Sequence, residues 1–139
     1  MLRSLAALVL VSLVILTGCR SAPTNPVERV DGASDLSAFT LRSLKGTRDG
    51  ERLDVQALYG DGAQSIRVDL QFNVSPPARL ASGTWRGLAG EGEVRQRSVT
   101  FLGGQSGPPS IGGRFDLIGP DHRPLYRVTI PLQELRHPL

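Results

Sequence analysis

The sequence is poor in the residues that build most catalytic and metal sites. Its 139 residues include one cysteine, two histidines, one tryptophan and a single lysine, Lys45. One cysteine excludes a disulfide within the chain, so packing alone has to stabilise the fold. The histidines, His122 and His137, cannot form a zinc site without carboxylates that no pattern selects. We therefore expect neither a cofactor nor a metal.

A short apolar segment near the N-terminus carries the clearest motif of the chain. Residues 5–16 are apolar but for one serine, and Arg3 precedes them. Their twelve residues fall short of the roughly 20 that a membrane-spanning helix needs, and match the apolar region of a signal peptide. The motif Leu16-Thr17-Gly18-Cys19 follows. With it, residues 1–19 resemble the precursors of bacterial lipoproteins.

The resemblance implies that residues 1–18 are removed and that Cys19 becomes a lipidated N-terminus. Two or three acyl chains there give stable anchoring, where one chain would be marginal. Arg20 follows, rather than the aspartate that is the best-known inner-membrane retention signal of Gram-negative lipoproteins. We therefore expect an outer-membrane protein facing the periplasm, if the source is Gram-negative. The alternative is an uncleaved anchor helix with an incidental cysteine.

The rest of the chain divides into a tether and one domain. Residues 19–34 begin with the lipidated cysteine, contain Pro23 and Pro26, and show no periodicity, which predicts a flexible tether. Residues 35–139 are long enough for a single domain with its own core. Removal of residues 1–18 leaves 15 basic and 13 acidic side chains, so the charge gives no reason to expect a nucleic-acid partner.

Alternation of apolar and polar residues predicts that the domain is all-β. In residues 66–74, five apolar residues alternate with four polar ones, as in a half-buried strand. Seven strands are expected, at residues 39–44, 53–59, 66–74, 80–86, 94–102, 111–117 and 126–132. Gly60 and Gly62 predict a hairpin, and Pro131 places the last strand at an edge or ends it. The expected fold is an antiparallel β-sandwich of about seven strands, or alternatively a small β-barrel.

The most unusual segment is the loop at residues 103–113, which holds five glycines and two prolines. Long loops on rigid β scaffolds commonly carry recognition. Gln105, Ser106 and Ser110 could bind a neutral polar ligand or an extended partner peptide, so they form a candidate binding loop. The alternative is a connection without a partner. Gly112 and Gly113 would then mark a bulge or a close backbone approach.

A second candidate is a surface patch made of Trp85, Arg86, Arg95 and Arg97. An exposed tryptophan beside arginine can stack on a sugar or a peptide. The alternative is that Trp85 belongs to the core and that the arginines are simply solvated. The glycine-rich stretch at residues 87–92 lacks a dinucleotide-binding pattern and predicts a loose β-turn.

No catalytic arrangement stands out. Residues 104–108 resemble the turn around a hydrolase nucleophile, but Pro108 replaces the required glycine. His122 and His137 lie in a turn and near the C-terminus, where histidines are usually solvated. We therefore expect a non-enzymatic, lipid-anchored β-module for binding or envelope assembly, with an envelope protein or peptide as partner. The alternatives are a barrel that holds a small apolar ligand, and an envelope hydrolase whose carboxylates the sequence does not identify.

Overall fold

The computed structural model describes residues 26–30, 36–103 and 108–135. Cys19, the predicted signal peptide and most of the predicted tether lie outside these ranges, as do Gln105, Ser106 and His137. All helices and strands assigned within the described ranges are β-strands. In the same ranges, no helix has the length and apolar character needed to cross a membrane.

The strands form one antiparallel sheet, which confirms the predicted all-β fold. They are β1 (Val27–Arg29), β2 (Thr40–Asp49), β3 (Arg52–Gly60), β4 (Ser65–Asn73), β5 (Arg79–Gly87), β6 (Gly90–Leu102), β7 (Ser110–Ile118) and β8 (Pro124–Glu134). Each of the seven predicted runs corresponds to one strand from β2 to β8, and the predicted hairpin joins β3 to β4. The strand order is β1-β8-β7-β6-β5-β4-β3-β2, so each strand from β2 to β7 pairs with the next strand along the chain, and β1 pairs with β8.

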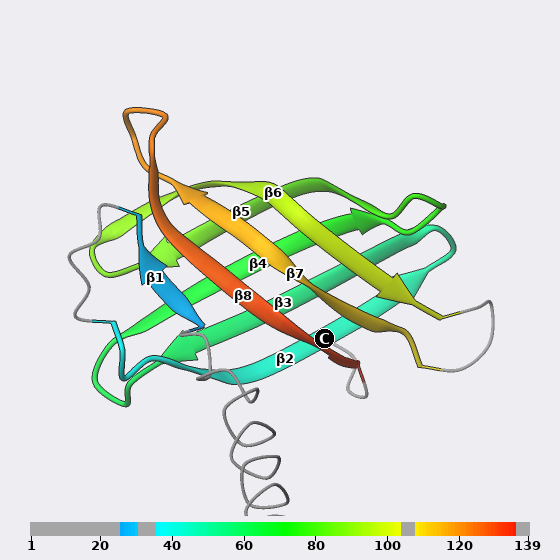
Figure 1. Cartoon of the computed structure of the whole chain (residues 1–139), viewed down its shortest axis with the longest axis horizontal. Coiled ribbons are helices and arrows are strands. Elements are labelled where there is room, and N and C mark those ends of the chain that lie inside the picture. The colour runs from blue at the N-terminus through cyan, green and yellow to red at the C-terminus, as the bar shows by residue number, and fades with distance from the viewer. Residues whose placement is uncertain (1–25, 31–35, 104–107, 136–139) are drawn as a thin grey trace, which may run out of the picture.

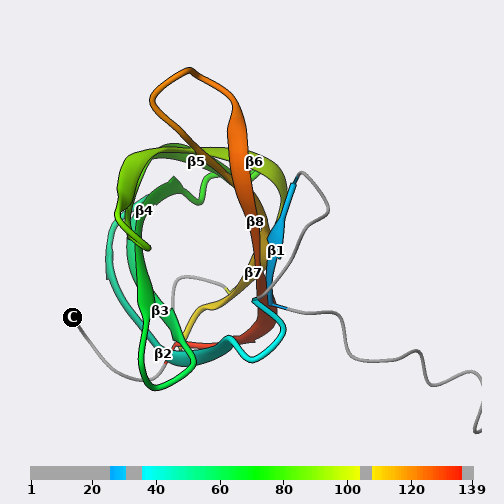
Figure 2. The same cartoon turned by 90° about the vertical axis from the view of Figure 1, so that its left-hand side faces the viewer.

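The sheet is strongly curled into a half-barrel (Figures 1 and 2), and β6 lies at the bend. The residues of β6 from Gly90 to Glu93 pair with β5, whereas those from Val94 onward pair with β7. Where the two strands are no longer paired, the Gln96 side chain bridges them by accepting a hydrogen bond from the Leu80 N–H at 2.6 Å. The fold thus lies between a sandwich and a closed barrel: one continuous sheet supplies both halves of the core.

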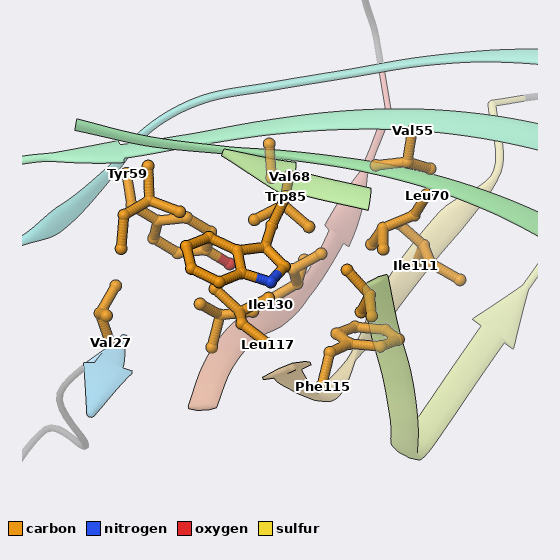
Figure 3. Close-up of a cluster of buried hydrophobic side chains, with 14 of the residues drawn as sticks. Val27, Val55, Tyr59, Val68, Leu70, Trp85, Ile111, Phe115, Leu117 and Ile130 are labelled. Atoms are coloured by element: carbon orange, nitrogen blue, oxygen red, sulfur yellow. The ribbon is translucent and has the colours of Figure 1, made fainter. Parts of the chain in front are cut away.

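The core lies inside the curled sheet. Buried residues alternate along β3 and β4, as the two-residue period of a strand requires. Phe72 of β4 meets Phe115 of β7 edge-on, with ring centroids 5.8 Å apart. Tyr59 of β3 donates its hydroxyl proton to the Thr129 carbonyl of β8 at 2.9 Å, and burial raises the pKa of Tyr59. Side chains from the two halves therefore meet across the interior (Figure 3).

Strand β1 corrects the predicted boundary between tether and domain. Residues 26–30 belong to the folded unit, because Val27 is fully buried and pairs with Val128 of β8. The Thr129 N–H also donates to the Pro26 carbonyl at 2.9 Å. A strand of three residues is too short to show a periodic pattern, and it forms because the edge of β8 offers hydrogen-bonding partners.

The last strand is an edge over part of its length, as Pro131 predicted. β1 pairs with β8 only at Tyr126, Arg127 and Val128. Beyond these residues β7 is the one described strand that pairs with β8. Pro131, which has no N–H to donate, therefore lies where β8 does not need a donor on the β1 side.

Candidate functional site

Trp85 does not belong to a surface patch, which corrects that part of the predicted site. Its side chain is buried, with 2% of the residue exposed. The indole Nε1–H donates to the Ile118 carbonyl at 2.9 Å, and the ring packs edge-on against Tyr126 with centroids 5.7 Å apart. Trp85 points inward because it occupies an inner position of β5, and its polar N–H is satisfied by β7.

The arginines of the predicted patch are exposed but separate into two environments. Arg86 lies on β5 and pairs in register with Arg67 and Glu91. On β6, Arg95 lies 3.6 Å from Glu93 and pairs in register with Asp116, and the Nη1 of Arg97 lies 3.2 Å from the same Asp116 carboxylate. The structure therefore brings Arg95 and Arg97 together beside Asp116, but it separates them from the buried Trp85.

Asp116 is the centre of an ion-pair group that the sequence did not reveal. It is the charged residue that the described part of the chain buries most, with 6% exposed. Its Oδ1 accepts from Arg127 Nε at 2.9 Å and its Oδ2 accepts from Arg97 Nη1 at 3.2 Å. These contacts connect β6, β7 and β8 on the outer face of the sheet. Two guanidinium groups on one carboxylate satisfy its oxygens, as a buried charge requires, so we assign the group a structural role.

The candidate binding loop is described only in part. Gln105 and Ser106 lie outside the described residues, while Ser110 begins β7 and pairs with Leu102 and Glu134. The close backbone approach predicted at Gly112 is confirmed, since a Cβ there would lie 2.8 Å from the Leu132 backbone. A register shift between Ile111 and Gly113 marks the predicted bulge. Ser110 is therefore held in the sheet ladder.

His122 and the acidic residues give no further site. His122 is exposed in the turn before β8, where it has a φ of 62° and its N–H donates to the Gly119 carbonyl at 3.0 Å. Within the described ranges, no group of three or more histidine, cysteine, aspartate or glutamate residues is placed to hold a metal ion.

A concave feature lies at the end of the half-barrel where β1 ends and β8 begins. We call this end, seen face-on in Figure 2, the mouth. The turns between β3 and β4 and between β5 and β6 also meet there. The mouth contains an open cavity of about 550 Å³, within the range of about 300–1,000 Å³ typical of small-molecule sites. It is lined by Arg29, Leu36, Gln64, Ser65, Leu88, Ala89 and Tyr126.

The turn between β5 and β6 is tight and strained, rather than the loose turn that its glycines predicted. Gly87 pairs directly with Gly90, so only Leu88 and Ala89 lie between the strands, with φ values of 52° and 60°. Two-residue turns of this kind favour Asn-Gly, because both residues need positive φ. Each non-glycine residue in that conformation costs about 1–2 kcal/mol. Both strained residues line the mouth cavity.

Close packing around the hairpin of β5 and β6 explains why it contains three glycines. A Cβ on Gly87 would lie 2.2 Å from the Ser65 carbonyl oxygen, and one on Gly92 would lie 1.9 Å from the Ile118 carbonyl oxygen. A Cβ on Gly90 would lie 3.0 Å from the Trp85 ring. The glycines therefore let the hairpin close over Trp85. Leu88, at its tip, packs against the core cluster while it lines the cavity.

The neighbouring turn at the mouth, between β3 and β4, is relaxed. Asp61 Oδ1 accepts hydrogen bonds from the N–H groups of Gln64 and Ala63 at 2.8 and 2.9 Å, and these bonds lower the pKa of Asp61. Gly62 supplies the positive φ of 97°. This turn fixes Gln64 and Ser65 at the cavity wall.

The sequence pattern could not locate the mouth. Its lining residues come from five separate segments, which only the curl of the sheet brings together. Comparisons with family profiles, with curated proteins and with solved structures give no significant match. The residues of the cavity themselves indicate what it can bind. Aliphatic and aromatic side chains lie beside an amide, a hydroxyl and a guanidinium group, so the lining suits a molecule that has both apolar and polar parts.

Proposed function

We propose that the chain is the precursor of a bacterial lipoprotein whose β domain is a non-enzymatic binding module of the cell envelope. The motif Leu16-Thr17-Gly18-Cys19 supports lipid anchoring through Cys19. The mouth cavity is the observation that supports binding, because it combines adequate volume, mixed lining and a strained turn in one place. Strained backbone persists where the surroundings fix it, and such sites cluster at ligand clamps.

The mouth is a better candidate than the interior of the sheet. An apolar ligand inside a barrel was the alternative prediction, but Phe72, Phe115 and Trp85 pack in that space and are nearly or fully buried. Protein interiors packed in this way lack room for a guest molecule. A binding function thus falls on the mouth, with the loop that contains Gln105 and Ser106 as the competing site.

Membrane anchoring would keep the domain near the bilayer. Six residues, 20–25, separate Cys19 from Pro26, the first residue that the structure describes. Six residues can reach at most about 20–22 Å. Because Arg20 follows the cysteine, we place the protein on the outer membrane, facing the periplasm, in a Gram-negative source.

Fatty-acid labelling tests the anchor. Cys19→Ser removes the sulfur that accepts the lipid, so the variant is expected to remain unprocessed and to incorporate no labelled fatty acid. Gly50→Ala, distant from the motif, is the matched control and is expected to be labelled as the wild type. Normal labelling of Cys19→Ser would exclude the lipoprotein assignment.

In-cell photo-crosslinking tests where the domain binds. A photoreactive residue is placed at Gln64 in the mouth, at Gln105 in the loop, or at Gln71 on the outer face of β4. We expect adducts at Gln64 and not at Gln71. Adducts at Gln105 alone would move the binding site to the loop, and no adduct at either position would refute the binding module.

A further inference from the structure

Two exposed aliphatic side chains lie at the same end of the half-barrel as the mouth cavity. Val30 and Leu125 are 42% and 37% exposed, and exposed aliphatic surface is unfavourable in water. The Val30 N–H donates to the Leu125 carbonyl at 3.1 Å, so the two residues are neighbours. They adjoin the lining residues Arg29 and Tyr126 in the chain. The end of the sheet that holds the cavity therefore also presents apolar groups to solvent.

The cavity walls differ in polarity. Leu36, Leu88 and Tyr126 provide aliphatic and aromatic surface, whereas Gln64 and Ser65 provide an amide and a hydroxyl on the β3–β4 side. A long molecule with an apolar body and a polar end satisfies both walls. A compact polar solute would leave the half-buried side chains of Leu88 and Tyr126 without an apolar partner, and a pure hydrocarbon would bury the amide without a hydrogen-bond partner.

The strained turn adds an independent argument. Asn-Gly in place of Leu88-Ala89 would adopt the same backbone at lower cost, and such stabilising changes are easily found in evolution. What Asn-Gly would lose is the apolar side chain of Leu88, which contacts both the core cluster and the cavity. The turn therefore has a leucine at the mouth although that residue has an unfavourable positive φ.

We infer that the mouth binds a single acyl chain, with its apolar body along Leu36, Leu88 and Tyr126 and its polar end toward Gln64 and Ser65. This inference rests on the proposed function, since an envelope anchor keeps the cavity within reach of lipids. The acyl chain has two sources of the same chemistry: an envelope phospholipid, or the lipid on Cys19 of the protein itself.

The test labels acyl chains in living cells. Cells that express the full chain are grown with a fatty acid carrying a diazirine, irradiated, and the protein is purified and digested with trypsin. We expect an adduct on the peptide spanning residues 87–95, which contains Leu88. An adduct with the mass of a phospholipid identifies the envelope source, whereas a crosslink to the peptide that begins at Cys19 identifies the anchor. Both outcomes support an acyl chain.

Paired variants separate binding from folding. Leu88→Asn combined with Ala89→Gly is expected to reduce the adduct about tenfold, the loss that follows removal of a leucine contact. Relief of the two positive φ values offsets the core contact that Leu88 loses, so Tm should stay near the wild-type value. Leu132→Asn, which changes a leucine that is 49% exposed at the far end of β8, is expected to leave the adduct unchanged.

Two results would overturn the inference. One is the absence of any adduct on residues 87–95 while other envelope proteins in the same cells are labelled. The other is an equal adduct in the wild type and in the Leu88→Asn, Ala89→Gly variant. The acylation of the Cys19 peptide is measured in the same digest, so failure of the proposed anchor is detected separately from failure of the mouth to bind.

Discussion

The two neighbouring turns at the mouth both reverse the chain between adjacent strands, but they obtain the positive φ values they need in different ways. Between β3 and β4, Asp61 accepts two backbone hydrogen bonds and Gly62 takes the positive φ, so each residue suits its conformation. Between β5 and β6, Leu88 and Ala89 both have positive φ, a conformation that costs each of them free energy. The first turn follows from local chemistry, whereas tertiary packing imposes the second.

Packing around Trp85 is what imposes the second turn. Gly87, Gly90 and Gly92 allow the hairpin to approach Ser65, Trp85 and the Ile118 carbonyl. A strained conformation persists when its surroundings over-determine it. This hairpin therefore combines unfavourable backbone conformations with close packing. Substitutions at Gly92 and Ala89 change the packing and the backbone strain separately.

The largest loss of stability is expected in the core, away from both turns. Leu70 is 3% exposed on the inner face of β4, so Leu70→Ala should lower the free energy of unfolding by about 2–5 kcal/mol. Arg67→Ala, on the outer face of the same strand, should change it by less than about 0.5 kcal/mol. Urea denaturation measures both. Equal losses would mean that both faces of β4 are buried.

The next effect concerns the packing that imposes the strained turn. Gly92→Ala places a Cβ 1.9 Å from the Ile118 carbonyl oxygen, which also accepts the Trp85 indole N–H. We expect a loss of about 3 kcal/mol, at the upper end of overpacking costs, and a red shift of Trp85 fluorescence. Gly50→Ala is the comparison: nothing lies within 4 Å of its Cβ position, so it should lose only the about 1–2 kcal/mol that its φ of 62° costs an alanine and leave the Trp85 fluorescence unchanged. A tolerated Gly92→Ala would show that close packing does not determine the hairpin path.

A smaller, pH-dependent effect is expected at the relaxed turn. Backbone hydrogen bonds from Gln64 and Ala63 lower the pKa of Asp61 in the folded state. The stability they provide is therefore complete above the unfolded carboxyl pKa of about 3.9 and is lost as the pH falls through the lower, folded pKa. Asp61→Ala should lower Tm at pH 7, and the difference from the wild type should shrink toward pH 2. A pH-independent difference would argue against a role for the carboxylate charge.

The smallest effect tests the strain itself. Ala89 is exposed and has a φ of 60°, so Ala89→Gly relieves about 1–2 kcal/mol of conformational cost and adds about 0.5–1 kcal/mol of unfolded-state entropy. We expect a net stabilisation of about 0.5–1 kcal/mol, measured by thermal denaturation. Ala57→Gly is the contrasting control, since Ala57 is fully buried in β3 and should lose stability. Destabilisation by Ala89→Gly would show that this turn is not strained.

Much of the fold was predictable because it depends on neighbouring residues. The alternation in residues 66–74 specified one strand and its buried face, and Gly60 and Gly62 specified the turn before it. The close approach at Gly112 was also predictable, since glycine at a strand start often has that role. These features need only the period of a strand and the conformational range of glycine.

The features that the sequence pattern did not predict depend on contacts between strands or were too short to form a pattern. The Asp116 group joins residues separated by 19 and 11 positions, and their meeting requires the register of β6, β7 and β8. Trp85 carried no signal for its direction beyond the strand period, and the arginine beside it suggested a surface. The three residues of β1 were too few to form a pattern and were assigned to the tether.

The sequence by itself determined seven strands, the buried face of those with clear alternation such as residues 66–74, and the position of the relaxed turn, because alternation and turn chemistry act over a few residues. Only the tertiary structure decided that the strands form one curled sheet, that Val27 completes it beside β8, and that Leu88 and Ala89 adopt a costly conformation. The physical reason is that curl, edge pairing and close packing around Trp85 arise between strands. The mouth exists only where those strands meet.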